Sequence, residues 1–211
     1  GKIIDLLSFH PTDHDGDAVE QIKSSTVSAI AEAYSNRESA TLRVGQAKNS
    51  TSPVDRRRER SALRRATSES VDPNLTVLHF ELDSGGESII FNYACHPVCT
   101  TPNETLLSSD WPGYVYERFK DEFDTVMFIN GAAGNINPRD HSLDREGEKV
   151  YAYMKEIGDE IANTVEKALS SIDSGSGFRE APIISKSIKL PLAVKSTPPV
   201  KLLEQKQEEV E

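Results

Sequence analysis

Apolar and polar positions recur along this chain with two different periods, and each period predicts its own kind of element. Apolar residues three or four positions apart predict helices over residues 17–35, 112–123 and 146–171. Shorter apolar or alternating runs predict strands over residues 3–9, 41–46, 74–82, 88–94 and 125–129. Because strands alternate with helices, the pattern predicts an α/β fold in which a mixed sheet has flanking helices.

The segments between the predicted elements are polar and carry turn signals. A Ser-Gly-Gly turn at residues 84–86 joins the strands on either side of it into a hairpin. Residues 48–70 are rich in Ser and Arg and only weakly patterned, which favours a long surface loop. The alternation at residues 182–192 predicts one more strand.

The last residues of the chain predict a separate element. A Thr-Pro-Pro break at residues 197–199 is followed by an acidic helical pattern over residues 202–211. We therefore expect one domain over residues 1–195 and the start of a helical segment over residues 196–211.

Composition narrows the classes of function. The 211 residues carry a net charge of −10, which argues against nucleic acid as the main partner because phosphate binding requires concentrated Lys and Arg. No run of about 18 apolar residues occurs, so the sequence predicts no transmembrane helix. Glycosylation sequons at Asn49, Asn74 and Asn103 are compatible with secretion, but chance could supply them, and a cytoplasmic location is equally compatible.

The two cysteines flank a histidine. On an extended strand Cys95 and Cys99 would lie roughly 13 Å apart, too far for a disulfide. A metal site made of these two thiols and His96 is one interpretation, although the usual second pair of ligands is missing. Buried free thiols are the interpretation that we favour.

Three predicted strands end in polar residues, and this shared feature predicts where a site would lie. His10 follows the first strand, His96 follows the hairpin, and a turn over residues 131–138 follows the strand at 125–129. In open α/β sheets the loops at the carboxyl ends of strands gather at one end of the sheet and form the ligand crevice. The two imidazoles could face one metal there, or each could merely cap its strand with a hydrogen bond.

The turn at residues 131–138 is rich in small residues and amides. Two glycines and two alanines at residues 131–134, Gly134 among them, let the backbone approach a neighbouring group closely. Asn135 and Asn137 add uncharged donors. Donors of this kind can stabilise a developing oxyanion. The alternative is a tight strand-to-helix connection that uses small residues for packing. The turn is not a phosphate loop, because it lacks the Gly-Lys-Ser ending.

Two charged residues are further candidates. Asp110 stands at a predicted helix start, where capping is the simplest role and orientation of a metal-bound histidine is the sharper one. Arg56, in a basic block, could contact an anion or oxyanion, although runs of arginine are most often solvated.

Together, three motifs resemble the N-terminal catalytic domain of the neutral/alkaline, non-lysosomal ceramidase family, in its uncharacterised microbial branch. They are residues 91–97 (FNYACHP), 108–114 (SSDWPGY) and 128–138 (FINGAAGNINP), which agree in order and spacing. The resemblance implies that residues 1–195 are part of that domain. It also implies zinc as cofactor and hydrolysis of an N-acyl amide into a fatty acid and an amine.

The resemblance also implies roles for individual residues. His96 matches the zinc histidine that follows the hairpin, and His10 matches a second zinc ligand after the first strand. Arg56 falls where the family contacts the polar end of the substrate. This chain departs from the family at Thr12, in place of a second histidine, and at Asn137, in place of a serine implicated in catalysis. The family's remaining ligands, a glutamate and a tyrosine, correspond to positions far downstream of residue 211.

Three hypotheses follow. The first is a zinc-dependent amidohydrolase, a linear-amide hydrolase acting on a small-molecule or lipid N-acyl substrate, with Asn137, Arg56 and Asp110 at its catalytic site and Gly134 and Asn135 binding substrate. The second is a non-catalytic binding protein that kept the fold, which Thr12 and Asn137 favour because neither can transfer a proton as histidine does. The third is a carbohydrate-processing hydrolase, which would need paired carboxylates that the sequence does not show.

Overall fold

The computed structural model describes residues 16–56, 71–100, 107–140, 145–180, 184–189 and 191. The chain divides into two units, the first ending at Arg179 and the second beginning at Glu180. The first unit contains three helices among its described residues, namely α2 (Gly16–Ser35), α4 (Asp110–Phe119) and α5 (Glu148–Ser170). Its strands are β1 (Ala40–Lys48), β2 (Pro53–Asp55), β3 (Asn74–Leu82), β4 (Glu87–Tyr93), β5 (Thr125–Asn130) and β6 (Ile136–Pro138).

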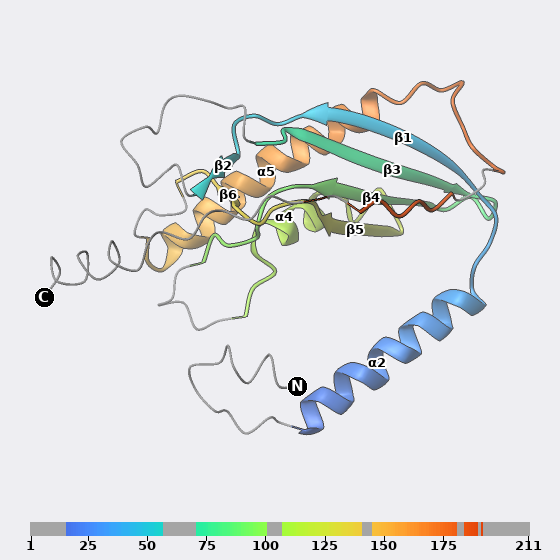
Figure 1. Ribbon diagram of the computed structural model, residues 1–211, viewed down its shortest axis with the longest axis horizontal. Helices are drawn as coiled ribbons and strands as arrows, with labels where there is room; N and C mark the ends of the chain where they lie inside the picture. The colour runs from blue at the N-terminus through green and yellow to red at the C-terminus, as the bar shows by residue number, and fades with distance from the viewer. Residues whose placement is uncertain are drawn as a thin grey trace, which may run out of the picture. The chain divides into compact units, whose positions relative to one another are not determined.

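Four strands form the main sheet, in the order β1-β3-β4-β5 (Figure 1). β3 is antiparallel to both β1 and β4, whereas β5 runs parallel to β4. β1, β4 and β5 therefore point the same way and finish at one end of the sheet, at Lys48, Tyr93 and Asn130. We call this end the site end. A second sheet pairs β2 with β6. These two strands follow β1 and β5 along the chain, so they come just after the site end.

The core lies between one face of the sheet and the pair α4 and α5. Helix α5 packs against β1 and β3, and α4 packs against α5 and β5. Alternate strand residues point into this core, as expected for a sheet covered on one face. The largest fully buried side chains include Trp111, Tyr93, Phe91, Phe119, Leu75, Ile89, Met154, Ile157 and Ile161. We call the covered face of the sheet the inner face.

The predicted α/β class and mixed sheet are confirmed, and the long periodic elements agree best. The hairpin, α2 and α5 match the predicted ranges to within two residues at each end. The predicted helix at 112–123 instead begins at Asp110 and ends at Phe119, after which the chain forms turns. Two short strands were not predicted. β2 lies within the expected loop, and β6 lies within the turn at residues 131–138.

One prediction near the end of the chain is wrong. The pattern at residues 182–192 predicts a strand, but residues 184–189 and 191 adopt no regular secondary structure. Three predicted features lie outside the described residues. They are the strand at residues 3–9, the greater part of the loop predicted at residues 48–70 (residues 57–70), and the domain boundary after residue 195. In the described part of the chain, every helix is too short or too polar to cross a bilayer.

Close packing of α4 on α5 depends on Gly158. A Cβ atom added there would lie 2.6 Å from Cβ of Tyr114 and 2.9 Å from the carbonyl oxygen of Trp111. We expect Gly158→Ala to lower the free energy of unfolding, because overpacking costs about 1–3 kcal/mol while alanine gains only about 1 kcal/mol in helix propensity. Denaturant unfolding measures the change. Asn163→Ala, at an exposed position of the same helix, should be neutral or stabilising. If both variants changed stability alike, the packing account would be wrong.

Candidate functional site

The candidate site lies where the carboxyl ends of β4 and β5 meet the small sheet formed by β2 and β6. Tyr93 and Asn130 are paired at the ends of the two parallel strands, so the segments that follow them start side by side. The backbone N–H of Gly131 donates to the Tyr93 carbonyl over 3.0 Å and continues this pairing by one step. Because His96 follows β4 and the 131–138 turn follows β5, the parallel pairing of these strands brings both to the site end.

The backbone of His96 is fixed on both sides. Its N–H donates to the carbonyl of Ile136 over 3.0 Å, and its own carbonyl accepts from the indole N–H of Trp111 over 3.2 Å. Trp111 is fully buried and its ring meets that of Phe128 edge to face, with centroids 4.8 Å apart. The His96 side chain is half-buried, and its ring makes no hydrogen bond to any described residue. The imidazole is therefore held at the site end without being packed into the core.

The glycines of the turn have two different roles. A Cβ atom at Gly131 would lie 3.2 Å from backbone and side-chain atoms of Ala94, so this glycine permits close packing on the end of β4. A Cβ atom at Gly134 would meet nothing within 4 Å. The backbone N–H groups of Gly134 and Asn135 donate to no described residue, whereas that of Ala133 is used within the turn. Packing thus explains Gly131, and open space with available donors surrounds Gly134.

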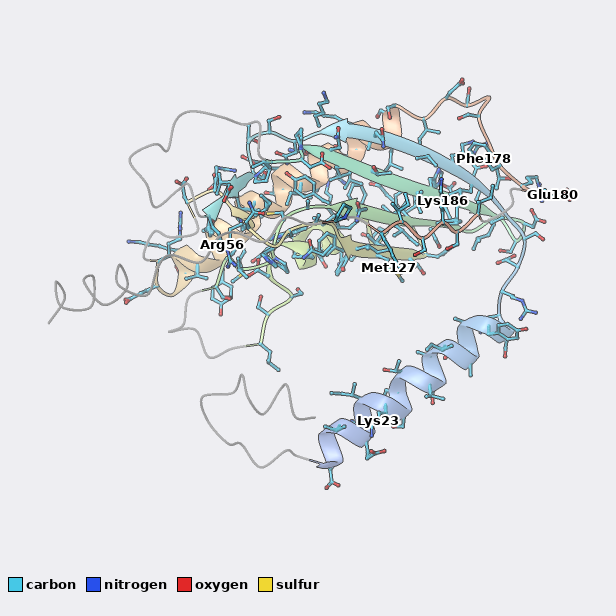
Figure 2. The ribbon with its side chains drawn as sticks, in the orientation of Figure 1. Lys23, Arg56, Met127, Phe178, Glu180 and Lys186 are labelled. Carbon is cyan, nitrogen blue, oxygen red and sulfur yellow. The ribbon has the colours of Figure 1, made fainter. Side chains whose placement is uncertain are left out.

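Arg56 lies directly against this open part of the turn (Figure 2). Its backbone N–H donates to the carbonyl of Asn135 over 2.9 Å, and one guanidinium nitrogen donates to the carbonyl of Gly134 over 3.2 Å. The Arg56 side chain is exposed, and a guanidinium has five N–H donors, so further donors remain for a ligand. β2 positions this residue because it ends at Asp55, one residue earlier.

Asn137 contains a buried acceptor with no partner. The residue is 5% exposed and sits in β6 opposite Val54. Its side-chain oxygen accepts no hydrogen bond from any described residue. An unsatisfied buried acceptor costs about 1–3 kcal/mol. This oxygen has less than 1 Å² of accessible surface, so a ligand N–H would reach it only after its surroundings shift.

Asp110 does not cap α4 in the predicted way, because it is the first residue of the helix and Ser109 is the N-cap. One carboxylate oxygen accepts from the N–H of Trp111 over 2.8 Å. The other accepts from the N–H groups of Cys99 over 2.8 Å and Thr100 over 3.3 Å. Asp110 adopts a positive φ of 54°, a conformation that Asp tolerates better than most residues. It therefore fixes the segment after His96 and reaches that histidine only through Trp111.

The cysteines are free and buried, as favoured from the sequence. Burial raises the pKa of the Cys95 thiol well above its usual value, and the Asp110 carboxylate raises it further. Burial likewise raises the pKa of Cys99, with added charge and hydrogen-bonding contributions from Asp110. Raised pKa values keep both buried thiols in the neutral form in the folded chain, as expected for free cysteines that pack in the core.

A polar network that sequence reasoning did not identify anchors β2 and β6 to α5. The buried Asn49 side chain accepts from the N–H of Ser52 over 3.0 Å, and the Ser52 hydroxyl donates to Glu160 over 2.7 Å. The Arg139 guanidinium donates to Glu160 over 2.5 Å, and its backbone N–H donates to the Ser52 carbonyl over 2.6 Å. The Tyr93 hydroxyl donates to the Asn49 carbonyl over 3.2 Å.

No residue in this network stood out in the sequence, because its members are far apart along the chain. The only sequence signal at these positions was the Asn49 sequon, which predicts glycosylation and not a structural network. Asn49 is 4% exposed and its amide nitrogen donates to the Ser52 hydroxyl over 3.0 Å, so the folded chain offers no accessible acceptor for a glycan there.

The structure brings together most of the residues singled out by the sequence. Hydrogen bonds or strand pairing connect five of them around the turn, namely Arg56, His96, Gly134, Asn135 and Asn137. Asp110 contacts the segment after His96 and not the turn, and His10 lies outside the described residues. Within the described ranges, no three His, Cys, Asp or Glu side chains are placed to hold a metal ion. The described part of this site thus contributes one imidazole, that of His96, as a candidate metal ligand.

The comparisons with known proteins agree on the fold. No protein-family description matches this chain, and no curated protein matches its sequence. The structure is similar to the neutral ceramidase from Pseudomonas aeruginosa, with a TM-score of 0.55 and 20% identity, covering 68% of this chain. It is also similar to a ceramidase complexed with C2, with a TM-score of 0.51 and 20% identity, covering 63% of this chain. The chain spans about a quarter of these proteins, 25% and 22% of their lengths. The fold is therefore ceramidase-like.

Glu160 makes the anchoring of the site sensitive to pH. Burial opposes its ionisation, but hydrogen bonds from Ser52 and Arg139 and the Arg139 charge outweigh burial, so its pKa is lowered below the usual 4.5. A lowered pKa in the folded state adds stability at pH values above the unfolded-state pKa, and that stability is lost as the pH falls through the folded-state pKa.

We therefore expect Glu160→Gln to lower the free energy of unfolding at pH 7 by about 1 kcal/mol, as for a partly exposed hydrogen-bonded ion pair. The variant should also lose less stability than the parent between neutral pH and pH values below 4.5. Denaturant unfolding at several pH values measures both effects. Asp159→Asn, which removes an exposed carboxylate paired with Lys155, is the matched control and should change stability little. Equal effects of the two variants would contradict the anchoring role.

Proposed function

We propose that this chain forms part of a zinc-dependent hydrolase that cleaves the amide bond of an N-acyl substrate, as expected for a ceramidase-like protein. The observation that carries the proposal is the convergence of His96, Arg56 and the 131–138 turn at the site end. The ceramidase-like fold supports it, since proteins named ceramidases share this arrangement of strands and helices. A lipid or other small-molecule amide is the proposed substrate.

The proposed cofactor would be held by histidine. His96 is the described candidate ligand, because its ring is half-buried at the site end and makes no hydrogen bond to the described residues. His10 is the proposed second ligand on the basis of the resemblance. Catalytic zinc takes three protein ligands in most enzymes, so the remainder would come from further sequence of a longer protein. Zinc, when bound, supplies a Lewis acid that polarises a carbonyl and lowers the pKa of water.

The other residues would bind and orient the substrate. The Arg56 guanidinium, which lies on the turn at Gly134, would donate to the carbonyl oxygen as negative charge develops on it. The unused N–H groups of Gly134 and Asn135 would offer further donors to the ligand. The unpartnered oxygen of Asn137 would accept the substrate amide N–H once a shift of the surrounding residues uncovers this buried atom. Asp110 would act as a positioning residue, since it fixes the segment after His96 through main-chain hydrogen bonds.

A second candidate function is binding of an N-acyl compound without turnover. Asn137 favours this candidate, because an amide side chain can bind a substrate but cannot act as nucleophile or base. Thr12 favours it too, since it stands where the resemblance expects a histidine. Both candidates use the same donors at Gly134 and Asn135, so only a measurement of turnover separates them.

The zinc site is tested by metal content. In the full-length protein, we expect His96→Ala to abolish stoichiometric zinc, because removing one ligand of a three-ligand site leaves too few. Elemental analysis of the purified protein measures it. His79→Gln is the matched control, since His79 lies within β3 and bonds Glu87 over 2.8 Å. Undiminished zinc in the His96 variant would exclude His96 as a ligand.

Turnover is tested with a panel of N-acylsphingosines, N-acyl amino acids and aryl esters. We expect the full-length protein to release fatty acid from an N-acyl amide, and a chelator to abolish the release until zinc is restored. Arg56→Ala should lower kcat/KM at least about tenfold, as expected when a charged donor to the carbonyl oxygen is lost. Arg37→Ala, at an exposed position of the same charge, should leave it unchanged. Saturable binding without any release would favour the non-catalytic candidate instead.

A further inference from the structure

The short sheet formed by β2 and β6 is closed at each end by a backbone hydrogen bond from an arginine. At one end the Arg56 N–H donates to the carbonyl of Asn135 over 2.9 Å. At the other end the Arg139 N–H donates to the carbonyl of Ser52 over 2.6 Å. Three residue pairs lie between these bonds, and a two-stranded sheet of that size is marginally stable at best on its own. Its place in the fold therefore depends on what holds its ends.

One carboxylate oxygen of α5 bridges the two strands at the Ser52 end. Oε2 of Glu160 accepts from the Ser52 hydroxyl over 2.7 Å and from the Arg139 guanidinium over 2.5 Å. Ser52 comes directly before β2 and Arg139 comes directly after β6, so this oxygen binds the flank of each strand. Helix α5 itself packs against β1 and β3 (Figure 1). Glu160 thus attaches the small sheet to the main body of the fold.

Two other groups support the same end. The hydroxyl of Tyr153, also on α5, donates to the carbonyl of Arg139. The side-chain oxygen of Asn49 accepts from the N–H groups of Thr51 and Ser52, over 3.1 and 3.0 Å. Asn49 is buried, and its carbonyl accepts from a tyrosine at the end of β4. The Ser52 end is therefore the fixed end of the small sheet.

The opposite end belongs to the candidate site, because the Arg56 guanidinium donates to the carbonyl of Gly134 over 3.2 Å. That contact requires the present register of β2 against β6. A shift of one residue would turn each side chain of β2 to the other face. Three pairs of backbone alone specify a register weakly, whereas a carboxylate that binds both Ser52 and Arg139 fixes it.

We propose that Glu160 is a positioning residue for Arg56. By joining Ser52 to Arg139, it sets the register of the small sheet and holds the Arg56 guanidinium against the turn at Gly134. The four residues from Ser52 to Arg56 span roughly 13 Å at 3.3 Å per residue, so Glu160 acts on the ligand only through Arg56. The role of Arg56 toward the ligand rests on the proposed function.

A positioning role differs from a general contribution to stability in what it changes in folded molecules. A residue that only stabilises the fold changes the folded fraction and leaves the ligand affinity of the folded molecules as it was. A residue that positions Arg56 changes that affinity, and its effect disappears when the Arg56 side chain is absent. Comparing single and double variants therefore separates the two roles.

Hydrogen exchange of the full chain, followed by NMR at neutral pH without zinc or ligand, tests whether Glu160 holds Arg56. We expect Glu160→Gln to speed exchange of the Arg56 N–H at least about fivefold, because β2 and β6 detach more often while the core stays folded. Ile89→Val is the stability control, since it trims a fully buried side chain at the other end of β4 and should leave Arg56 unchanged. Equal acceleration in both variants, or none in Glu160→Gln, would overturn the proposal.

Ligand affinity tests whether this hold serves the site. For a non-hydrolysable N-acyl amide and the full-length protein, we expect Glu160→Gln to raise Kd at least about threefold in folded molecules. Asp159→Asn, which removes an exposed neighbouring carboxylate, should leave Kd unchanged. In an Arg56→Ala background, Glu160→Gln should raise Kd no further.

The two failures are distinguishable. An equal rise in Kd with and without the Arg56 side chain would overturn the positioning role, because Glu160 would then act by another route. Absence of binding in the parent protein would instead contradict the proposed function. In that case the exchange of the Arg56 N–H still decides whether Glu160 positions Arg56, since that measurement needs neither zinc nor ligand.

Discussion

The hydrogen bond from the backbone N–H of His96 to the carbonyl of Ile136 is the contact on which the candidate site depends. It joins the segment after β4 to the turn after β5, beyond the point where the two parallel strands end. β6 begins at that same Ile136 and pairs with β2, so Arg56 is brought to the turn by the same junction. Trp111, buried beneath it, donates to the His96 carbonyl and ties the junction to α4.

The long elements could be predicted because their apolar period is sustained over many residues, as in α5 and in the hairpin of β3 and β4. The short strands β2 and β6 could not, because three residues such as Pro53–Asp55 show no period. They pair with each other, and the network of Asn49, Ser52, Arg139 and Glu160 holds them against α5. The strand predicted over residues 182–192 failed for the related reason that alternation without a paired neighbour does not define a strand.

For the site, the structure brings together several residues that the sequence singled out, whereas their roles stay predictions. His96, Arg56 and the turn were named from position after strands and from resemblance, and the structure places His96 and Arg56 each in contact with the turn. Asp110 differs, because its oxygens hold the main chain at Cys99 and Thr100, a contact that no local pattern encodes. The orphaned oxygen of Asn137 could be found only from coordinates, since it depends on which neighbours fail to reach it.

Diffraction from crystals of the full-length protein, collected at the zinc absorption edge with a non-hydrolysable N-acyl amide bound, tests the central claim most directly. The account predicts an anomalous peak about 2.0–2.1 Å from an imidazole nitrogen of His96, with the ligand carbonyl facing Gly134 and Asn135. A peak elsewhere in the protein, with the amide bound away from the 131–138 turn, would contradict it.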